Sequence, residues 1–296
     1  MTAELIQKYV THSGEDEAWG LYLLDVGKSK TVAGSNYPVG AHPPDYIFNF
    51  KRGRVLEEYQ VLYISEGQGI FDSDPSGRLL VETGSVLLVY PGIRHRYRPS
   101  KRTGWRESWV GFRGPLADHI MQGNMFHPGQ PVIKTGLHNR LNEMYDQILV
   151  ECNQEKPGYQ QLAAGLVMEL LGMVHMYRKT YRLNNRYIES RINTSKRLME
   201  ELFRQDTAPR EIARQLGMGY SNFRKQFRLY TGLSPGQYLI QLRIREAKSL
   251  LYNTHLPVKA IAEESGFNSS YYFVRLFRNK VGMTPGEFRQ KARGLI

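Results

Sequence analysis

The chain carries one short pattern twice near its C-terminal end, and this repeat restricts its fold more than any other feature. Residues 211–239 read EIARQLGMGYSNFRKQFRLYTGLSPGQYL, and residues 261–289 read IAEESGFNSSYYFVRLFRNKVGMTPGEFR. The matching positions are Ile212, Ala213, Gly217, Phe223, Phe227, Gly232, Ser234 and Pro235 in the first copy, and Ile261, Ala262, Gly266, Phe273, Phe277, Gly282, Thr284 and Pro285 in the second. The offset grows from 49 to 50 residues across the central turn, so the second copy has one more residue there.

Each part of the repeat predicts a local structure. The Ile-Ala pair predicts the buried face of a short helix, and the glycine after it predicts a left-handed residue that ends this helix. Two phenylalanines four positions apart predict the buried stripe of a second helix. After a further glycine, Ser-Pro or Thr-Pro predicts the start of a third helix, with the hydroxyl as N-cap and proline in the first turn. Each copy therefore predicts a helix-turn-helix unit, which places its second helix in the major groove of DNA.

One such unit is a weak signal, whereas two copies in a basic segment are a strong one. Residues 234–254 predict a long helix between them, which would hold the two reading helices at a fixed distance suited to successive major grooves, roughly 34 Å apart. From residue 188 onward the chain has 19 Lys and Arg against 9 Asp and Glu, while the part before it has 21 against 19. This excess favours double-stranded DNA as a partner, although a solvated basic surface would have the same composition.

The first half of the chain has the pattern of β-strands. The segments YQVLYISEGQGIF, GRLLVETGSVLLVYPGIRHRY and WRESWVGF are short, rich in apolar residues and separated by glycine turns, which predicts a small barrel or sandwich. Residues 137–148 and 162–177 then carry apolar side chains at helical spacing around a Pro-Gly break, which predicts a helical hairpin. The hairpin either only covers the barrel or also pairs two chains, and we favour a homodimer.

Other broad classes are disfavoured by what the sequence lacks. The chain has one cysteine, Cys152, so it cannot form an internal disulfide. Its first residues do not form a signal peptide, and no apolar run approaches the ~20 residues of a membrane span. We therefore expect a cytoplasmic protein with no membrane partner.

The repeat resembles the C-terminal signature of the AraC/XylS family of transcription regulators over residues 188–296. In the first half, RGRVLEEYQVLYISEGQGIF, GSVLLVYPGIRHRYRP and GWRESWVGFRG resemble the cupin-like ligand-binding domain of the sugar-responsive members. The resemblance implies an α+β chain. It would have a cupin-like β-barrel with a helical hairpin at 1–180, for effector binding and dimerisation, a linker at 181–189, and an all-α domain with two helix-turn-helix motifs at 190–296. It also implies an N-terminal arm that closes over the effector, and RNA polymerase as a partner.

Side chains that leave the phenylalanine stripe are the candidates for DNA contact. Ser221, Arg224 and Lys225 match base-reading positions of the family. The full set is Ser221, Asn222, Arg224 and Lys225 in the first reading helix, and Ser270, Tyr271, Val274, Arg275 and Arg278 in the second, with Arg278 suited to a phosphate. Arginine bound to guanine is the commonest specific base contact, while a solvated surface charge is the alternative at each position.

The effector pocket of the family corresponds to Arg52, Tyr97, Glu107 and Trp109, with Asn36 or Tyr37 approaching from the preceding segment; Arg54 replaces Arg52 if the register slips by two. Charged and amide groups bind sugar hydroxyls, and an indole packs on the C–H face of a sugar ring. Where the sugar-binding relatives have a histidine, this chain has Glu107. The alternative is that Trp109 and Tyr97 are ordinary barrel core.

No metal, cofactor or catalytic residue is predicted. Cupin enzymes hold a metal with a His-x-His pair, whereas His95 is followed two positions later by Tyr97. The sequence predicts a DNA-binding transcription regulator, an activator controlled by a small sugar-like effector, and not an enzyme. The alternatives are a DNA-binding regulator whose barrel only dimerises and a cupin-type sugar enzyme.

Overall fold

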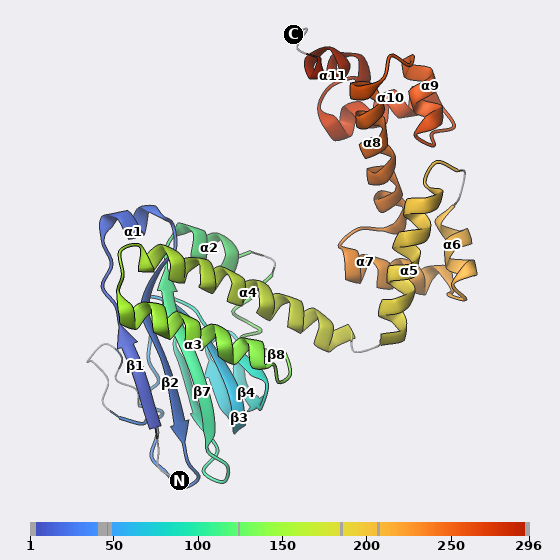
Figure 1. The fold of residues 1–296 in the computed structure, drawn as a ribbon. Helices are drawn as coiled ribbons and strands as arrows, with labels where there is room; N and C mark the ends of the chain where they lie inside the picture. The colour runs from blue at the N-terminus through green and yellow to red at the C-terminus, as the bar shows by residue number, and fades with distance from the viewer. Residues whose placement is uncertain are drawn as a thin grey trace. The chain divides into compact units, whose positions relative to one another are not determined.

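The computed structural model describes residues 4–40, 46, 49–123, 125–183, 186–205 and 208–293. The chain forms two compact units, Met1–Asn184 and Asn185–Ile296. Figure 1 shows a sheet covered by helices in the first unit and helices alone in the described part of the second. This mixed architecture confirms the predicted fold class.

The first unit is built on one antiparallel sheet. Its strands are β1 (Glu4–Tyr9), β2 (Tyr22–Thr31), β3 (Tyr59–Ser73), β4 (Gly77–Glu82), β5 (Ser85–Val89), β6 (His95–Pro99), β7 (Trp105–Arg113) and β8 (Val132–Lys134). Their order is β1-β2-β7-β3-β5-β8, and β4 and β6 both pair with β3. Within the described residues the pairings end at β1 and β8, so the sheet is an open path and does not close on itself.

The long strand β3 connects two parts of this sheet. Its first half pairs with β5 and β7, and its second half, from Gln68 onward, pairs with β4 and β6. The change occurs at an irregularity between Ile64 and Glu66 and at Gly67, which has φ +84°. A Cβ atom at Gly67 would lie 2.1 Å from the carbonyl oxygen of Gly104, so the bend requires glycine there.

Strand alternation separates two apolar cores. In β3, Val61 and Tyr63 belong to the core beneath the helices, while Leu62 and Ile64 belong to a second core on the opposite face. Successive side chains of a strand point to opposite faces, so a strand buried on both sides has a nearly continuous apolar sequence. This accounts for the run VLYI in the sequence.

Helices cover one face of the sheet. They are α2 (Pro115–Met121), α3 (Asn139–Gln154) and α4 (Tyr159–Leu183), while the short helix α1 (Gly14–Ala18) has no buried residue. In Figure 1, α3 and α4 lie against each other across the strands, which confirms the predicted helical hairpin. The Tyr145 hydroxyl of α3 donates to the backbone oxygen of Val61 at 3.0 Å and ties the hairpin to the sheet.

The second unit contains the two predicted helix-turn-helix motifs. Its helices are α5 (Arg186–Leu202), α6 (Pro209–Gln215), α7 (Tyr220–Thr231), α8 (Pro235–Asn253), α9 (Val258–Glu264), α10 (Ser270–Val281) and α11 (Pro285–Ala292). Ser234 and Thr284 cap α8 and α11 as predicted, each in a capping box followed by proline. The glycines that end α7 and α10, Gly232 and Gly282, are left-handed.

The predicted helix between the motifs is α8, and it belongs to two cores. Leu239 and Leu242 pack with Phe223 and Phe227 of the first motif, while Ala247 and its neighbours pack with the phenylalanines of the second. Both motifs are therefore anchored to one continuous helix, as the repeat predicted.

The predicted linker at 181–189 contains the boundary between the two units. Helix α4 continues to Leu183 and α5 begins at Arg186, so most of this segment is helical. Absence of apolar periodicity is typical of a loop, but it is also compatible with the exposed end of a helix. None of the described helices has both the length and the apolar character needed to span a bilayer.

Candidate functional site: a polar cavity and two exposed helices

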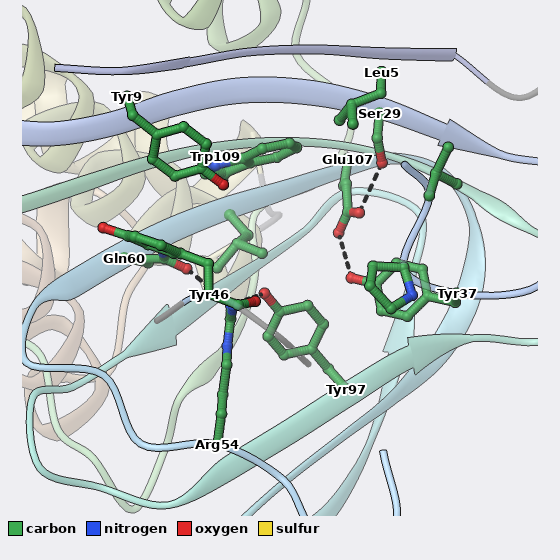
Figure 2. A pocket seen from close by; sticks show the side chains of 13 residues that line it. Leu5, Tyr9, Ser29, Tyr37, Tyr46, Arg54, Gln60, Tyr97, Glu107 and Trp109 are labelled. Carbon is green, nitrogen blue, oxygen red and sulfur yellow. Dashed lines mark hydrogen bonds between the residues drawn. The ribbon is translucent and has the colours of Figure 1, made fainter. Parts of the chain in front are cut away.

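A cavity opens between the sheet and the N-terminal segments of the first unit. Its empty volume is about 480 Å³ with the mouth included. Figure 2 shows polar side chains from several strands converging on it, with Leu5 and Tyr9 of β1 along one side. Tyr37, Tyr97, Glu107 and Trp109, which the resemblance assigned to an effector pocket, line this cavity together. Arg52 and Asn36 do not line it.

The cation of the cavity is Arg54, not Arg52. Arg54 and His95 exchange two backbone hydrogen bonds of 2.9 Å, which places the Arg54 side chain beside β6. Its Nη2 donates to the Tyr97 hydroxyl at 2.7 Å and to Oε1 of Gln60 at 3.3 Å. Arg52 is exposed on the surface. Arg54 therefore takes the place that the sequence analysis gave first to Arg52, two residues earlier. The sequence could not choose between them, because an isolated bridge in a loop leaves no strand pattern.

Glu107 is the acid of the cavity. The hydroxyls of Ser29 and Tyr37 donate to its two carboxylate oxygens at 2.8 and 3.1 Å. Burial in the low-dielectric interior raises the pKa of Glu107 to about 7, against the opposing effects of these hydrogen bonds and the nearby Arg54 charge. Ser29 was missed by the sequence analysis, which identified no strand around it.

Trp109 is held by a buried carboxyl group that the sequence analysis also missed. Its indole nitrogen donates to Oδ1 of Asp25 at 2.6 Å. Gln60 donates from one amide nitrogen to both Asp25 and Glu58, at 3.3 and 2.8 Å. Burial, followed by the neighbouring Glu58 charge, raises the pKa of Asp25 well above its ordinary value.

The Asp25–Glu58 pair is fitted against the backbone of β7. A Cβ atom at Gly111 would lie 2.1 Å from Oδ2 of Asp25 and 2.6 Å from Oε1 of Glu58. Only glycine leaves room for both carboxyl groups at that point. The Tyr46 hydroxyl donates to the other oxygen of Glu58 at 2.9 Å and completes this wall of the cavity.

His95 has a structural role beside the cavity. Burial and the Arg54 charge lower its pKa to about 4, so the ring is neutral at neutral pH. Its Nε2 accepts from Nε of Arg54 at 3.3 Å, and its Nδ1 lies 3.0 Å from the backbone oxygen of Ile93. Within the described residues, no group of three or more His, Cys, Asp or Glu side chains is arranged to hold a metal ion.

The second unit presents two comparable helices, α7 and α10. Phe223 and Phe227 of α7 and Phe273 and Phe277 of α10 are fully buried. Their burial leaves the remaining predicted DNA contacts on the opposite faces. Exposed are Ser221, Asn222, Arg224, Lys225, Ser270, Tyr271, Arg275 and Arg278.

Two details distinguish the predicted DNA contacts on α10. Val274 is only half-exposed, because it packs against the core of the second motif. Tyr271 is 78% exposed, more than any other large hydrophobic side chain among the described residues of this unit. No ion pair is recorded for Arg224, Lys225 or the α10 arginines among the described residues, in contrast to Arg214, which pairs with Glu211 at 2.6 Å.

Both parts of the chain match known protein families. Residues 37–171 match the family described as the AraC-like ligand binding domain, and residues 212–291 match a helix-turn-helix domain. The first match spans most of the cavity, including Arg54, Tyr97 and Glu107. The second begins at Ile212 and contains both copies of the repeat from that position onward.

Similar proteins include two operon regulatory proteins and a transcriptional activator. The MmsAB operon regulatory protein of Pseudomonas aeruginosa is 27% identical over 80% of this chain and 76% of its own length. The transcriptional activator RhaS of an Enterobacter species is 25% identical over 78% of this chain and 85% of its own. The raffinose operon regulatory protein RafR of Pediococcus pentosaceus is 21% identical over 89% of this chain and 98% of its own.

Proposed function

Because this chain belongs to the AraC family of transcription regulators, we propose that it controls an operon in response to a small sugar-like effector bound in the N-terminal cavity. It binds DNA as a regulator and is not an enzyme, in line with the regulators it resembles. We further propose that the protein activates transcription, that it forms a homodimer and that it contacts RNA polymerase. A cytoplasmic location follows as a prediction from the DNA partner.

The main support for DNA binding is the pair of exposed helices α7 and α10, which are both anchored to the single helix α8. Each reading helix buries two phenylalanines and turns cations outward, at Arg224 in α7 and Arg275 in α10. A bidentate arginine contact to guanine discriminates by about 1–3 kcal/mol, whereas phosphate contacts add affinity without sequence information. We assign base contacts to these two arginines and a phosphate contact to Arg278.

The cavity supports a sugar-like effector through its mixture of groups. Arg54, Gln60 and Glu107 offer donors and acceptors within a buried space, and hydroxyl-rich ligands require both. Trp109 and Tyr97 add aromatic surface for the C–H face of a ring. The similarity to RafR, a raffinose operon regulatory protein, supports control of a sugar operon, and the similarity to RhaS, a transcriptional activator, supports activation.

Of the two helices in the hairpin, α4 offers a better surface than α3 for pairing two chains. It carries a stripe of exposed apolar side chains, Leu162, Met168 and Met176, which are 51%, 36% and 47% exposed. Gly165 and Gly172 lie on the same exposed side and have no atom within 4 Å of an added Cβ, so a second helix can approach closely there. We propose that two chains pair along this stripe.

A selection experiment tests the proposal as a whole. The purified full chain is used to select duplexes from a random pool, and binding to the enriched sequence is measured with and without each member of a broad panel of sugars. We expect one enriched sequence and one sugar class that changes both the binding to it and the melting temperature of the protein. A specific duplex without any sugar response would instead favour the regulator whose sheet domain only dimerises.

A further inference from the structure

A second hollow lies beside the effector cavity and shares one wall with it. This side pocket is lined by Thr31, Asn36, Tyr37, Phe50, Arg98 and Lys101, among other residues, and its empty volume is about 610 Å³ with the mouth included. Tyr37 lines both hollows, and its hydroxyl donates to Glu107 inside the cavity (Figure 2). Asn36, which the sequence analysis assigned to the effector, lies here.

The charge of the side pocket is positive. Arg98 and Lys101 contribute to its lining, and no Asp or Glu does so among the described residues. The two preceding outward arginines of the same region are neutralised, since Arg94 pairs with Asp74 and Arg96 pairs with Asp72. No ion pair is recorded for Arg98 or Lys101 within the described part of the chain.

The geometry of Arg98 leaves its donors available to a ligand. Its guanidinium lies over the ring of Phe50, 4.1 Å from the centroid. This cation–π contact attracts the guanidinium to the ring, and none of its N–H groups makes a recorded hydrogen bond among the described residues. A planar fork held in this way is suited to the oxygens of a phosphate or carboxylate.

The walls of the side pocket are held by close backbone contacts. The amide of Gly34 donates to the Lys101 carbonyl at 2.8 Å. A Cβ atom at Gly104 would lie 2.0 Å from the carbonyl oxygen of Thr31, so the loop of Lys101 is packed tightly against the end of β2. The Thr31 hydroxyl oxygen is buried and has no hydrogen-bond partner among the described residues.

We propose that the side pocket binds an anionic group, a phosphate or a carboxylate, on an effector whose sugar ring lies in the cavity. This rests on the proposed function, because it names the class of sugar that the same site takes. Within the cavity, the guanidinium of Arg54 is already bound to Tyr97 and Gln60, and the carboxyl group of Glu107 disfavours an anion beside it. The neighbouring cations on the other side of Tyr37 give that group a place outside the acidic interior.

Calorimetric titration of the full chain tests this with matched ligands. Each sugar of the panel is offered as the neutral sugar, as its phosphate ester and as its uronic acid, and inorganic phosphate is offered alone. The variant Arg98→Ala/Lys101→Ala removes the two cations. The control variant Lys51→Ala/Arg102→Ala removes the same charge from exposed positions that do not line the pocket.

We expect one anionic form to bind about tenfold more tightly than its neutral parent, a gain typical of a charge-assisted contact near solvent. The Arg98/Lys101 variant loses this preference and keeps the affinity for the neutral sugar, while the control variant keeps both. The phosphate and uronate arms identify which anion is bound.

Three outcomes overturn the inference. Equal binding of the neutral and anionic forms rejects it and leaves the proposed function standing. So does a preference that survives removal of Arg98 and Lys101. If no sugar binds in any form, the proposed sugar effector is rejected and the inference fails with it.

Discussion

Glu107 is a buried acid of the cavity wall whose pKa is set by its surroundings. It is 4% exposed, and burial raises its pKa to about 7 although two hydroxyls donate to it. The folded protein therefore binds a proton at Glu107 that the unfolded chain releases at lower pH. This part of the free energy of unfolding is fully present below the ordinary glutamate pKa and is lost as pH rises towards 7.

Replacing Glu107 by Gln should remove this pH dependence. Relative to Glu107→Gln, the wild type should lose up to about 3 kcal/mol of unfolding free energy between pH 5 and pH 8, since each pKa unit corresponds to about 1.4 kcal/mol. Urea denaturation of both proteins across this range measures the difference. Parallel pH profiles for the two proteins would show that Glu107 has an ordinary pKa.

Arg275 and Arg278 lie on the same helix but should behave differently. Arg275→Ala should lower discrimination at one base pair of the selected duplex by about 1–3 kcal/mol. Arg278→Ala should weaken selected and unrelated duplexes by the same factor. Fluorescence anisotropy with single base-pair substitutions separates the two effects, and Arg224→Ala provides the matching test in α7. If neither Arg275→Ala nor Arg224→Ala lowers base discrimination, the assignment of the reading helices is wrong.

At the level of elements, a β-bulge connects the cavity to the helical hairpin. The pairing of β2 with β7 shifts between Leu23 and Asp25, and this shift brings Asp25 to the indole of Trp109. Gln160 at the start of α4 completes the hydrogen bonding there: its amide oxygen accepts from Leu23 N at 2.9 Å and its nitrogen donates to Leu23 O at 3.1 Å. The same nitrogen also donates to the carbonyl of Thr11 at 2.9 Å.

Gln160→Leu should therefore destabilise the first unit strongly. It leaves the backbone N–H and C=O of Leu23 buried without partners, which costs roughly 2–4 kcal/mol in total. The neighbouring Gln161→Leu is the control, because Gln161 donates only to Asp16 near the surface. Chemical denaturation followed by tryptophan fluorescence measures both, and similar losses for the two variants would contradict the role given to Gln160.

The exposed stripe of α4 gives a second prediction at this scale. Met168→Lys places a charge in the middle of the proposed dimer seam, and we expect it to raise the dimer dissociation constant at least about tenfold, because an unpaired charge is costly to bury. Sedimentation velocity over a range of concentrations measures this. Asn153→Lys, at an exposed position of α3, adds the same charge away from the stripe and should have no effect. If the wild-type chain is monomeric at every concentration measured, the proposed dimer seam on α4 is rejected.

At the scale of the whole molecule, the excess of cations after residue 188 should control how DNA binding responds to salt. The logarithm of the association constant should fall linearly with the logarithm of salt concentration, by about 0.9 per phosphate contacted. Removing Arg278 should reduce the magnitude of that slope by about one. Titrations between low and physiological salt measure both, and a slope near zero would exclude phosphate contacts as the source of affinity.

The sequence by itself determined the features that depend on local chemistry. The glycines after each short helix, the phenylalanines four positions apart and the Ser-Pro and Thr-Pro caps act within one or two turns, so both helix-turn-helix motifs and α8 were predictable. The hairpin of α3 and α4 followed from helical periodicity for the same reason.

Only the tertiary structure decided which side chains meet across the sheet. A shift of two residues in a loop brings Arg54 and not Arg52 to the cavity, and the bulge in β2 selects Asp25, although neither leaves a periodic signal in the sequence. Asn36 likewise lies in the side pocket rather than in the cavity. Strand register and loop path depend on partners far along the chain, and one residue of slip reverses which face a side chain occupies. That is why the helical half was predictable in detail and the cavity only in part.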